Sequence, residues 1–353
     1  MRKDDYIGAS ISTRIYEKNL LTRTELERLN DFDSLKDILA QLNDSIYRDP
    51  IESLVRPEEY EKILKAELKR VYELIEDFSP DENILKYMRE KYHFHNLKLI
   101  VKEVIQDKDY KELYLDMGEL DLAFIKKNLI KEDHKDKPFI SVDDLNLKNE
   151  EKVKKDEEVY LDFAKKAIEI FEKTKDPQDI DLYLDKVNYQ MKLEDAKNLG
   201  LEELIDFTRE DIDLINLKTL LRVKSQDESI DLLEESLIEG GFIEEDKFKE
   251  YFSMDLPRLK ASLAKSRISK YVDGLLKESR DLDDIILDLE KAIDAHMTDF
   301  TIDAKIVTFG PEVLLNFLIS KEIEIKNLRI LFVSKMNGLD RDLTLERLRK
   351  SYV

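Results

Sequence analysis

The sequence predicts an all-α protein, and three observations carry that prediction. The chain has 353 residues but only 8 glycines and 7 prolines, too few chain-breaking residues for the frequent turns of β-sandwiches and barrels. Charged residues make up 39% of it and hydrophobic residues 42%, a balance that suits amphipathic helices. Apolar residues also recur at spacings of three and four along most of the chain, which argues against disorder.

Charge and composition exclude several classes of function. The 59 Lys and Arg residues against 80 Asp and Glu residues give a net charge of −21, which repels nucleic-acid phosphates and anionic lipid headgroups. We therefore expect no nucleic-acid partner. The absence of cysteine excludes disulfides and thiolate chemistry. The most apolar stretch, residues 313–319, is far shorter than the roughly 20 residues that cross a bilayer. We expect a soluble chain with no direct membrane insertion.

Helix signals mark the elements in order. Residues 57–78 are predicted to form a long helix, because their apolar side chains recur every three or four residues: Tyr60, Ile63, Leu64, Leu68, Val71, Tyr72 and Ile75. Helix starts are predicted at Ser79-Pro80-Asp81-Glu82, Gly200-Leu201-Glu202 and Gly310-Pro311-Glu312. The highly charged residues 131–158 are interpreted as an exposed connection leading into the next helix, and Gly240-Gly241 as a helix C-cap.

Three segments share an Asn-Leu-basic core and indicate an internal repeat. They are Phe94-His95-Asn96-Leu97-Lys98, Leu214-Ile215-Asn216-Leu217-Lys218 and Ile325-Lys326-Asn327-Leu328-Arg329. Their period of roughly 115 residues is too long for solenoid repeats of 20 to 50 residues. We therefore predict three homologous helical domains, at 1–130, 131–255 and 256–353. Three similar domains in one chain tend to surround a pseudo-threefold axis, which gives a ring or funnel.

The repeated residues have predicted roles. Asn96, Asn216 and Asn327 are expected to be structural, each bonding one helix to the next within its domain. The cations two positions later, Lys98, Lys218 and Arg329, have two open interpretations. They either line a common cavity that receives an acidic partner surface, or simply extend to solvent.

No pattern of residues in the sequence gives strong evidence for a catalytic site. Asp283, Asp284 and Asp288 resemble the acidic motif that holds magnesium pyrophosphate in all-α prenyl transferases, but a matching second motif is missing, so a solvated helix face is preferred. His93 and His95 lack a third zinc ligand. The chain has neither a G-x-x-x-x-G-K-[ST] nor a G-x-G-x-x-G motif. We predict that the protein is not itself an enzyme and binds no cofactor.

The repeat segments also carry a resemblance to a known family. The run from Phe309-Gly310-Pro311-Glu312 to Asn327-Leu328-Arg329, followed by Asn337-Gly338-Leu339, resembles the C-terminal signature of the C subunit of V-type and archaeal or bacterial A-type ATP synthases. The d subunit of eukaryotic V-ATPases belongs to the same family. The first repeat core and the opening Tyr6-Ile7-Gly8 to Arg14-Ile15 are similar too. That opening usually has two basic residues flanking an apolar one, whereas only Arg14 is basic here.

The resemblance implies an all-helical funnel of three domains and a non-catalytic role. Such a subunit is a socket in the central stalk, between the central-shaft subunits of the catalytic head and the membrane rotor (proteolipid) ring. It lies peripherally on the cytoplasmic side of the cell membrane and couples ATP synthesis or hydrolysis to proton or sodium transport. We hypothesise that some of Arg14, Lys98, Lys218 and Arg329 form a basic cluster that contacts the shaft. Two alternatives stay open: a generic acidic helical scaffold or adaptor, and a magnesium-dependent enzyme using the Asp283/Asp284/Asp288 cluster.

Overall fold

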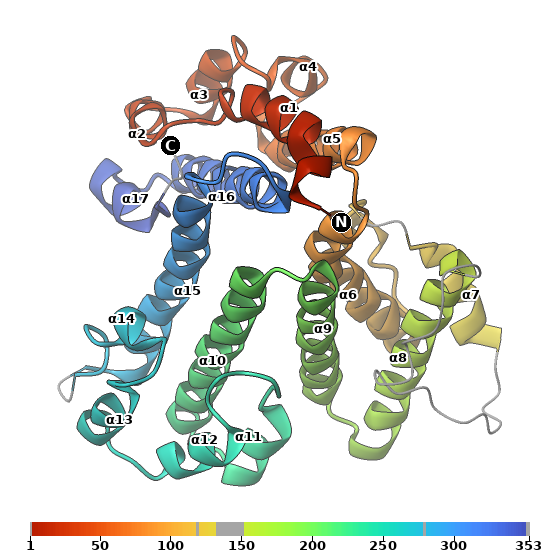
Figure 1. The fold of residues 1–353 in the computed structure, drawn as a ribbon, viewed down its shortest axis with the longest axis vertical. Helices are drawn as coiled ribbons and strands as arrows, with labels where there is room; N and C mark the ends of the chain where they lie inside the picture. The colour runs from red at the N-terminus through yellow and green to blue at the C-terminus, as the bar shows by residue number, and fades with distance from the viewer. Residues whose placement is uncertain (1, 118–119, 132–151, 278–279, 351–353) are drawn as a thin grey trace. The chain divides into compact units, whose positions relative to one another are not determined.

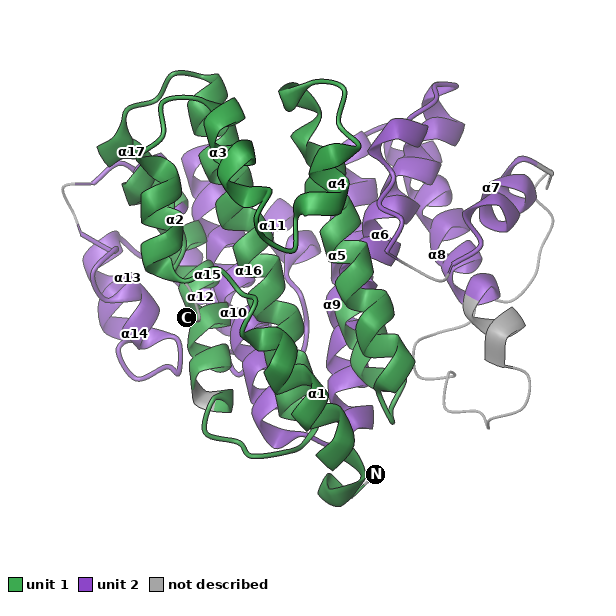
Figure 2. Cartoon of the chain, turned by 90° about the horizontal axis from the view of Figure 1, so that it is seen from above, with its two compact units in different colours: residues 1–88, 287–353 green, residues 89–286 purple. Residues whose placement is uncertain are grey.

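The computed structural model describes residues 2–117, 120–131, 152–277 and 280–350, which form helices joined by turns and loops (Figure 1). Within these ranges no strand occurs, so the predicted all-α class is confirmed. Contacts divide the chain into two compact units (Figure 2). Unit 1 comprises Met1–Met88 and Leu287–Val353, and unit 2 comprises Arg89–Ile286. The three-domain division and the funnel stay predictions.

Unit 1 combines the two ends of the chain around one central helix. Its helices are α1 (Ile7–Glu17), α2 (Arg23–Asn30), α3 (Leu35–Leu42), α4 (Arg48–Glu52), α5 (Tyr60–Phe78), α16 (Pro311–Met336) and α17 (Arg341–Arg347), with 3-10 turns at Lys3–Tyr6 and Pro57–Glu59. Helices α1, α2, α3, α5 and α17 all contact α16. A helix covered on several sides needs apolar residues on several faces, which explains the apolar stretch over residues 313–319.

Unit 2 contains the middle of the chain. Its helices are α7 (Leu122–Lys131), α8 (Lys152–Thr174), α9 (Pro177–Leu199), α10 (Glu202–Ser225), α11 (Ile230–Ser236), α12 (Glu245–Phe252), α13 (Leu256–Leu263) and α14 (Ser269–Val272), with a 3-10 turn at Lys111–Leu113. Helices α6 (Asn83–Gln106) and α15 (Leu282–Ala304) run across the boundaries between the units. Side chains of α6, α7, α8 and α9 form a large apolar core, and a smaller one joins α9 and α10 to Ile238.

The predicted helix starts agree closely with the structure. Helix α6 begins three residues after Pro80, α10 begins at Glu202, and α16 begins at Pro311. The predicted helix over 57–78 is observed as a 3-10 turn followed by α5. Gly200 adopts the left-handed conformation (φ 67°) that ends α9, which is the conformation glycine tolerates best.

Two sequence interpretations need correction. The charge pattern predicts a connection that extends to residue 158, but α8 already begins at Lys152; residues 132–151 lie outside the described residues. Gly240-Gly241 does not cap a helix, because α11 ends at Ser236 and the glycines lie in the loop that follows. A side chain at Gly241 would not fit, since its Cβ would lie 2.1 Å from the Asp213 carboxylate. Close approach of the loop to α10 therefore requires this glycine.

Candidate functional site

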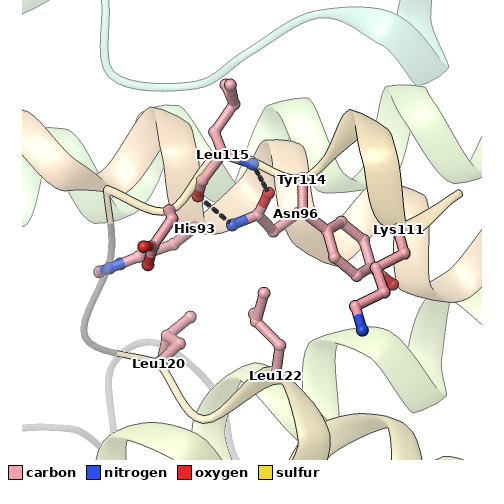
Figure 3. A pocket seen from close by; sticks show the side chains of 8 residues that line it. His93, Asn96, Lys111, Tyr114, Leu115, Leu120 and Leu122 are labelled. Atoms are coloured by element: carbon pink, nitrogen blue, oxygen red, sulfur yellow. Dashed lines mark hydrogen bonds between the residues drawn. The ribbon is translucent and has the colours of Figure 1, made fainter. Parts of the chain in front are cut away.

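The three segments that share the Asn-Leu-basic core, which we call signatures, contain Asn96, Asn216 and Asn327. Each of these asparagines makes the same pair of hydrogen bonds with the backbone of one residue further along the chain. On α6, Asn96 Nδ2 donates to the Leu115 carbonyl at 2.8 Å, and the Leu115 N–H donates to Asn96 Oδ1 at 2.9 Å (Figure 3). On α10, Asn216 exchanges the same two bonds with Ile238, both at 2.8 Å. On α16, Asn327 bonds Arg349 at 3.1 and 2.7 Å. We call these three pairs the asparagine locks.

The asparagine locks have a clear physical basis. A side-chain amide presents an N–H donor and a C=O acceptor side by side, so it can pair with the backbone C=O and N–H of one residue at once. All three asparagines are buried, with exposed fractions of 0 to 2%. A buried backbone segment without such partners would lose hydrogen bonds to water. Each lock thus fixes a loop to a signature helix.

A cavity of about 290 Å³ lies beside the first lock in unit 2 (Figure 3). It is lined by His93, Asn96, Lys111, Tyr114, Leu115, Asp116, Leu120 and Leu122. The Tyr114 hydroxyl donates to Glu103 Oε2 at 2.6 Å. Burial and this bond hold the pKa of Tyr114 well above its ordinary value, so the phenol stays protonated. The described lining contains no serine, threonine or cysteine nucleophile that His93 could activate.

His93 belongs to a buried polar cluster behind the cavity. Its Nδ1 lies 3.1 Å from the Tyr160 hydroxyl, which is itself 2.7 and 2.8 Å from the two carboxylate oxygens of Glu90. Since the phenol donates to the carboxylate, its oxygen is left to accept from the imidazole N–H. His95 is exposed, with Nε2 3.2 Å from the Leu113 carbonyl. The two histidines therefore have separate surroundings, and the cluster serves packing.

Lys98 and Arg329 both form ion pairs within their own unit. Lys98 Nζ lies 2.7 Å from Asp185 Oδ1 on α9. Arg329 on α16 makes a two-pronged contact with Glu61 on α5, at 2.7 and 3.0 Å. Lys218 is half-buried on α10. Each of the two observed pairs joins a signature helix to a neighbouring helix of the same unit.

Arg14 is also engaged within its own unit. Its guanidinium lies 2.8 Å from Glu17 Oε2 and donates to the backbone carbonyls of Lys305 and Val307, at 3.3 and 2.8 Å. The side chain is 29% exposed. This arginine therefore clamps the loop before α16 against the end of α1.

The three aspartates predicted as a cluster at the start of α15 lie in separate surroundings. Asp283 accepts from the Ser225 hydroxyl at 2.5 Å, and Asp288 pairs with Lys291 at 3.0 Å. Asp284 is exposed. Across the described residues, no group of three or more acidic or histidine side chains is placed to hold a metal ion.

A buried charge network in unit 1 is a feature that the sequence analysis missed. Lys321, only 1% exposed, lies 2.6 Å from Glu324 Oε1 and 3.1 Å from Glu67 Oε1. The Tyr47 hydroxyl donates to Glu324 at 2.5 Å, and Arg70 pairs with Glu67 at 2.7 Å. Burial and the Glu324 carboxylate raise the pKa of Tyr47 well above its ordinary value, which keeps it a donor.

A signal for this network is present in the sequence. Glu67 occupies a position in the apolar stripe of 57–78, between Leu64 and Leu68, where an apolar residue would be expected. A charged residue at a buried position requires a partner of opposite charge. Nothing in the sequence, however, shows that this partner is Lys321, which lies about 250 residues further along the chain.

A second missed feature is the loop around Gly240 and Gly241. The buried Asp213 carboxylate accepts from the N–H groups of Phe242 and Ile243, at 3.2 and 3.0 Å. Arg209 donates to the carbonyls of both glycines at 3.1 and 3.0 Å and stacks on the Phe242 ring. Burial raises the pKa of Asp213 to about 7, although the two backbone bonds and Arg209 act against that rise.

The raised pKa of Asp213 predicts a pH effect on stability. Between about pH 4 and 7 the native carboxyl holds a proton that the unfolded chain has released, so the free energy of unfolding falls as pH rises through this window. From pH 5 to pH 8 the free energy of unfolding of Asp213→Asn should rise by on the order of 1–3 kcal/mol relative to that of the wild type, because the asparagine does not titrate. Urea denaturation of both proteins at the two pH values measures this difference. Parallel pH profiles would contradict it.

The structure offers no candidate for a bilayer-crossing segment in the part of the chain that it describes, since its long helices are too polar for their length. The model of the ATP synthase (C/AC39) subunit family matches residues 12–347. Similar proteins include the C subunit of the V-type sodium ATPase of Enterococcus hirae, 24% identical over 95% of each chain. They also include the C subunits of the A-type ATP synthases of Thermoplasma volcanium, 23% identical over 96% of each chain, and of Methanocaldococcus jannaschii, 24% identical over 95% of this chain and 83% of the relative.

The family match covers nearly the whole described chain and includes all three asparagines of the asparagine locks. The all-helical fold of the described residues is consistent with a structural subunit. The chain therefore belongs to the ATP synthase (C/AC39) subunit family, as a structural rather than a catalytic subunit of a multisubunit rotary ATPase.

Proposed function

We propose that this chain is the socket of the central stalk in a V/A-type rotary ATPase. It receives the central shaft of the ATP-hydrolysing or ATP-synthesising head and sits on the membrane rotor ring, on the cytoplasmic side of the membrane. In this position it couples ATP turnover to proton or sodium transport. The observation that carries the proposal is the family match over residues 12–347, together with relatives named as the C subunit of a V-type sodium ATPase and of A-type ATP synthases.

We also infer that the socket is built from three homologous helical domains around a pseudo-threefold axis. The asparagine locks support this inference, because the bonded partner lies 19, 22 and 22 residues after the asparagine in the three copies. A chance resemblance among amphipathic helices would not reproduce the same two hydrogen bonds at each site. Loops bonded to helices and buried ion pairs also suit a part that transmits torque, since such a part must not deform under load.

Omitting this chain from the assembled complex tests the proposed function. The purified head without it should still hydrolyse ATP, while ATP-driven ion uptake into vesicles should fall to background. Adding the purified chain back should restore uptake. A complex that pumps normally without the chain would rule out the socket role and favour a scaffold outside the torque path.

The shaft contact of the basic residues is a separate prediction. Reversing Lys218 and Arg329 to glutamate should weaken binding of shaft subunits at low salt, with a smaller effect at high salt because screening already removes part of the attraction. Arg329→Glu also breaks the exposed pair with Glu61, which should cost at most about 1 kcal/mol of folding stability. Binding measured by calorimetry at two salt concentrations checks this. Unchanged affinity of the double variant at low salt would show that these cations do not touch the shaft.

A further inference from the structure

Helix α1 carries its large apolar side chains on the outside. Ile7, Ile11 and Ile15 recur every four residues, and their exposed fractions are 42%, 60% and 58%. Residues four apart lie on one face of a helix, so the three form a continuous ridge. No other described helix of this chain exposes three large hydrophobic side chains.

The buried face of α1 is small and polar instead. Ala9, Ser10, Thr13 and Glu17 are its buried residues, and the helix packs against α16. Ser10 Oγ accepts from the Gly310 N–H at 3.1 Å, and Thr13 Oγ1 donates to the Ala9 carbonyl at 2.8 Å. A helix on the surface of a soluble protein normally buries its large apolar residues and exposes the polar ones. Helix α1 reverses this pattern.

The shape of the exposed face suits another helix. Beside the isoleucine ridge lie two small residues that are also four apart, the exposed Gly8 and the half-buried Ser12. A Cβ added at Gly8 would meet nothing within 4 Å, so the space over this residue is open to a partner. When two helices pack, the ridge formed by side chains four residues apart on one helix fits between the side-chain rows of the other.

The charges around this face are also unusual for so acidic a protein. Between Ile7 and Asn19 the only carboxylate belongs to Glu17, which is buried and paired with Arg14. The exposed Lys18 lies at the C-terminal end of the helix, while Asp4 and Asp5 are exposed before its N-terminus. The face therefore has an apolar centre, an acidic end and a basic end.

A further exposed apolar side chain lies in the loop that Arg14 bonds. Ile306 is 89% exposed, and Arg14 bonds the carbonyls of the residues on either side of it. The bonds of Arg14 thus tie the backbone on both sides of Ile306 to helix α1. Apolar residues that are fixed outward by such bonds indicate a contact surface rather than loose packing.

We propose that this face of α1, defined by Ile7, Gly8, Ile11, Ser12 and Ile15, docks an amphipathic α-helix from a different subunit of the same ATPase. The proposal rests on the proposed function, which supplies such subunits. The docked helix places small and branched apolar residues against the isoleucine ridge and the small residues beside it, and an acidic residue near Lys18. A second copy of this chain is a poorer occupant, because three isoleucines cover far less than the roughly 1,200 Å² that a stable dimer buries.

Paired substitutions in the complex test this docking. The complex is purified through a tag on a head subunit, and this chain is quantified in the eluate. Ile11→Asp with Ile15→Asp should lower its recovery at least about tenfold. Val55→Asp and Leu343→Asp, at exposed apolar positions of the same unit away from α1, should change it less than about twofold. Recovery of the α1 variant at wild-type level would overturn the proposal.

Photocrosslinking separates the possible occupants and does not depend on a destabilising change. With p-benzoyl-L-phenylalanine in place of Ile11, the assembled complex should give a crosslink to a helical segment of another subunit, found by mass spectrometry. A crosslink between two copies of this chain, or none at all, would overturn the proposal. If the wild-type chain itself fails to purify with the head, the proposed function fails and not only the docking surface.

Discussion

Replacing Lys321 with methionine is expected to destabilise the protein by about 3–5 kcal/mol. The ammonium is almost fully buried between Glu67 and Glu324, so its removal leaves two carboxylates in the interior with one cation fewer. Glu67 keeps Arg70, but Glu324 keeps only neutral donors, the Tyr47 hydroxyl and the Leu21 N–H. An uncompensated buried charge of this kind is among the most costly single changes.

Urea denaturation followed by circular dichroism measures the Lys321 effect. The double variant Lys321→Met with Glu324→Gln should recover a large part of the loss, because it removes the uncompensated charge as well. Arg329→Met is the matched control: its pair with Glu61 is exposed, so it should cost at most about 1 kcal/mol. A loss below about 1 kcal/mol for Lys321→Met would show that the cluster is not a charge network in solution.

Replacing Asn216 with alanine should have the next largest effect, about 2–4 kcal/mol. The asparagine is fully buried and satisfies both the N–H and the C=O of Ile238, so alanine leaves a buried donor and a buried acceptor without partners. Among the described hydrogen bonds, only those of Arg209 and Asp213 to residues 240–243 would then hold the loop after α11 to α10. Thermal and urea denaturation measure the change.

The other asparagine locks give graded comparisons. Asn96→Ala and Asn327→Ala should cost less than Asn216→Ala, because their partners Leu115 and Arg349 are only half-buried and water can reach the freed backbone groups. Asn128→Ala serves as a control, since the Asn128 side chain bonds the Phe124 carbonyl on the exposed side of α7 and should matter by about 0.5 kcal/mol at most. Equal, small effects at all four positions would refute the structural role of the locks.

Local signals determined much of the helical framework. Proline and glycine fix where a helix can begin or end through their own backbone restrictions, which is why the starts of α10 and α16 follow directly from Gly200 and Gly310-Pro311. The apolar stripe of 57–78 likewise determined α5, because side-chain spacing along a helix depends only on its turn. The recurrence of Asn-Leu-basic also indicated that three positions of the chain are equivalent.

Tertiary structure alone decided what those residues contact. The spacing identifies Asn216 but not Ile238 as its partner, and it identifies Lys98 and Arg329 but not the carboxylates of Asp185 and Glu61 that pair with them. Periodicity shows which face of a helix is apolar, whereas the neighbouring element depends on contacts between distant parts of the chain.

Helix α1 shows this limit most clearly, because its apolar face would be expected to point inward. By itself, the sequence determined an all-α chain with three asparagine signatures and the family resemblance that they carry. Tertiary structure decided that the small face of α1 packs on α16 and that its isoleucines face outward. It also decided that Lys321 is buried between two glutamates. The physical reason is that periodicity is a local property, whereas burial depends on which distant surfaces fit together.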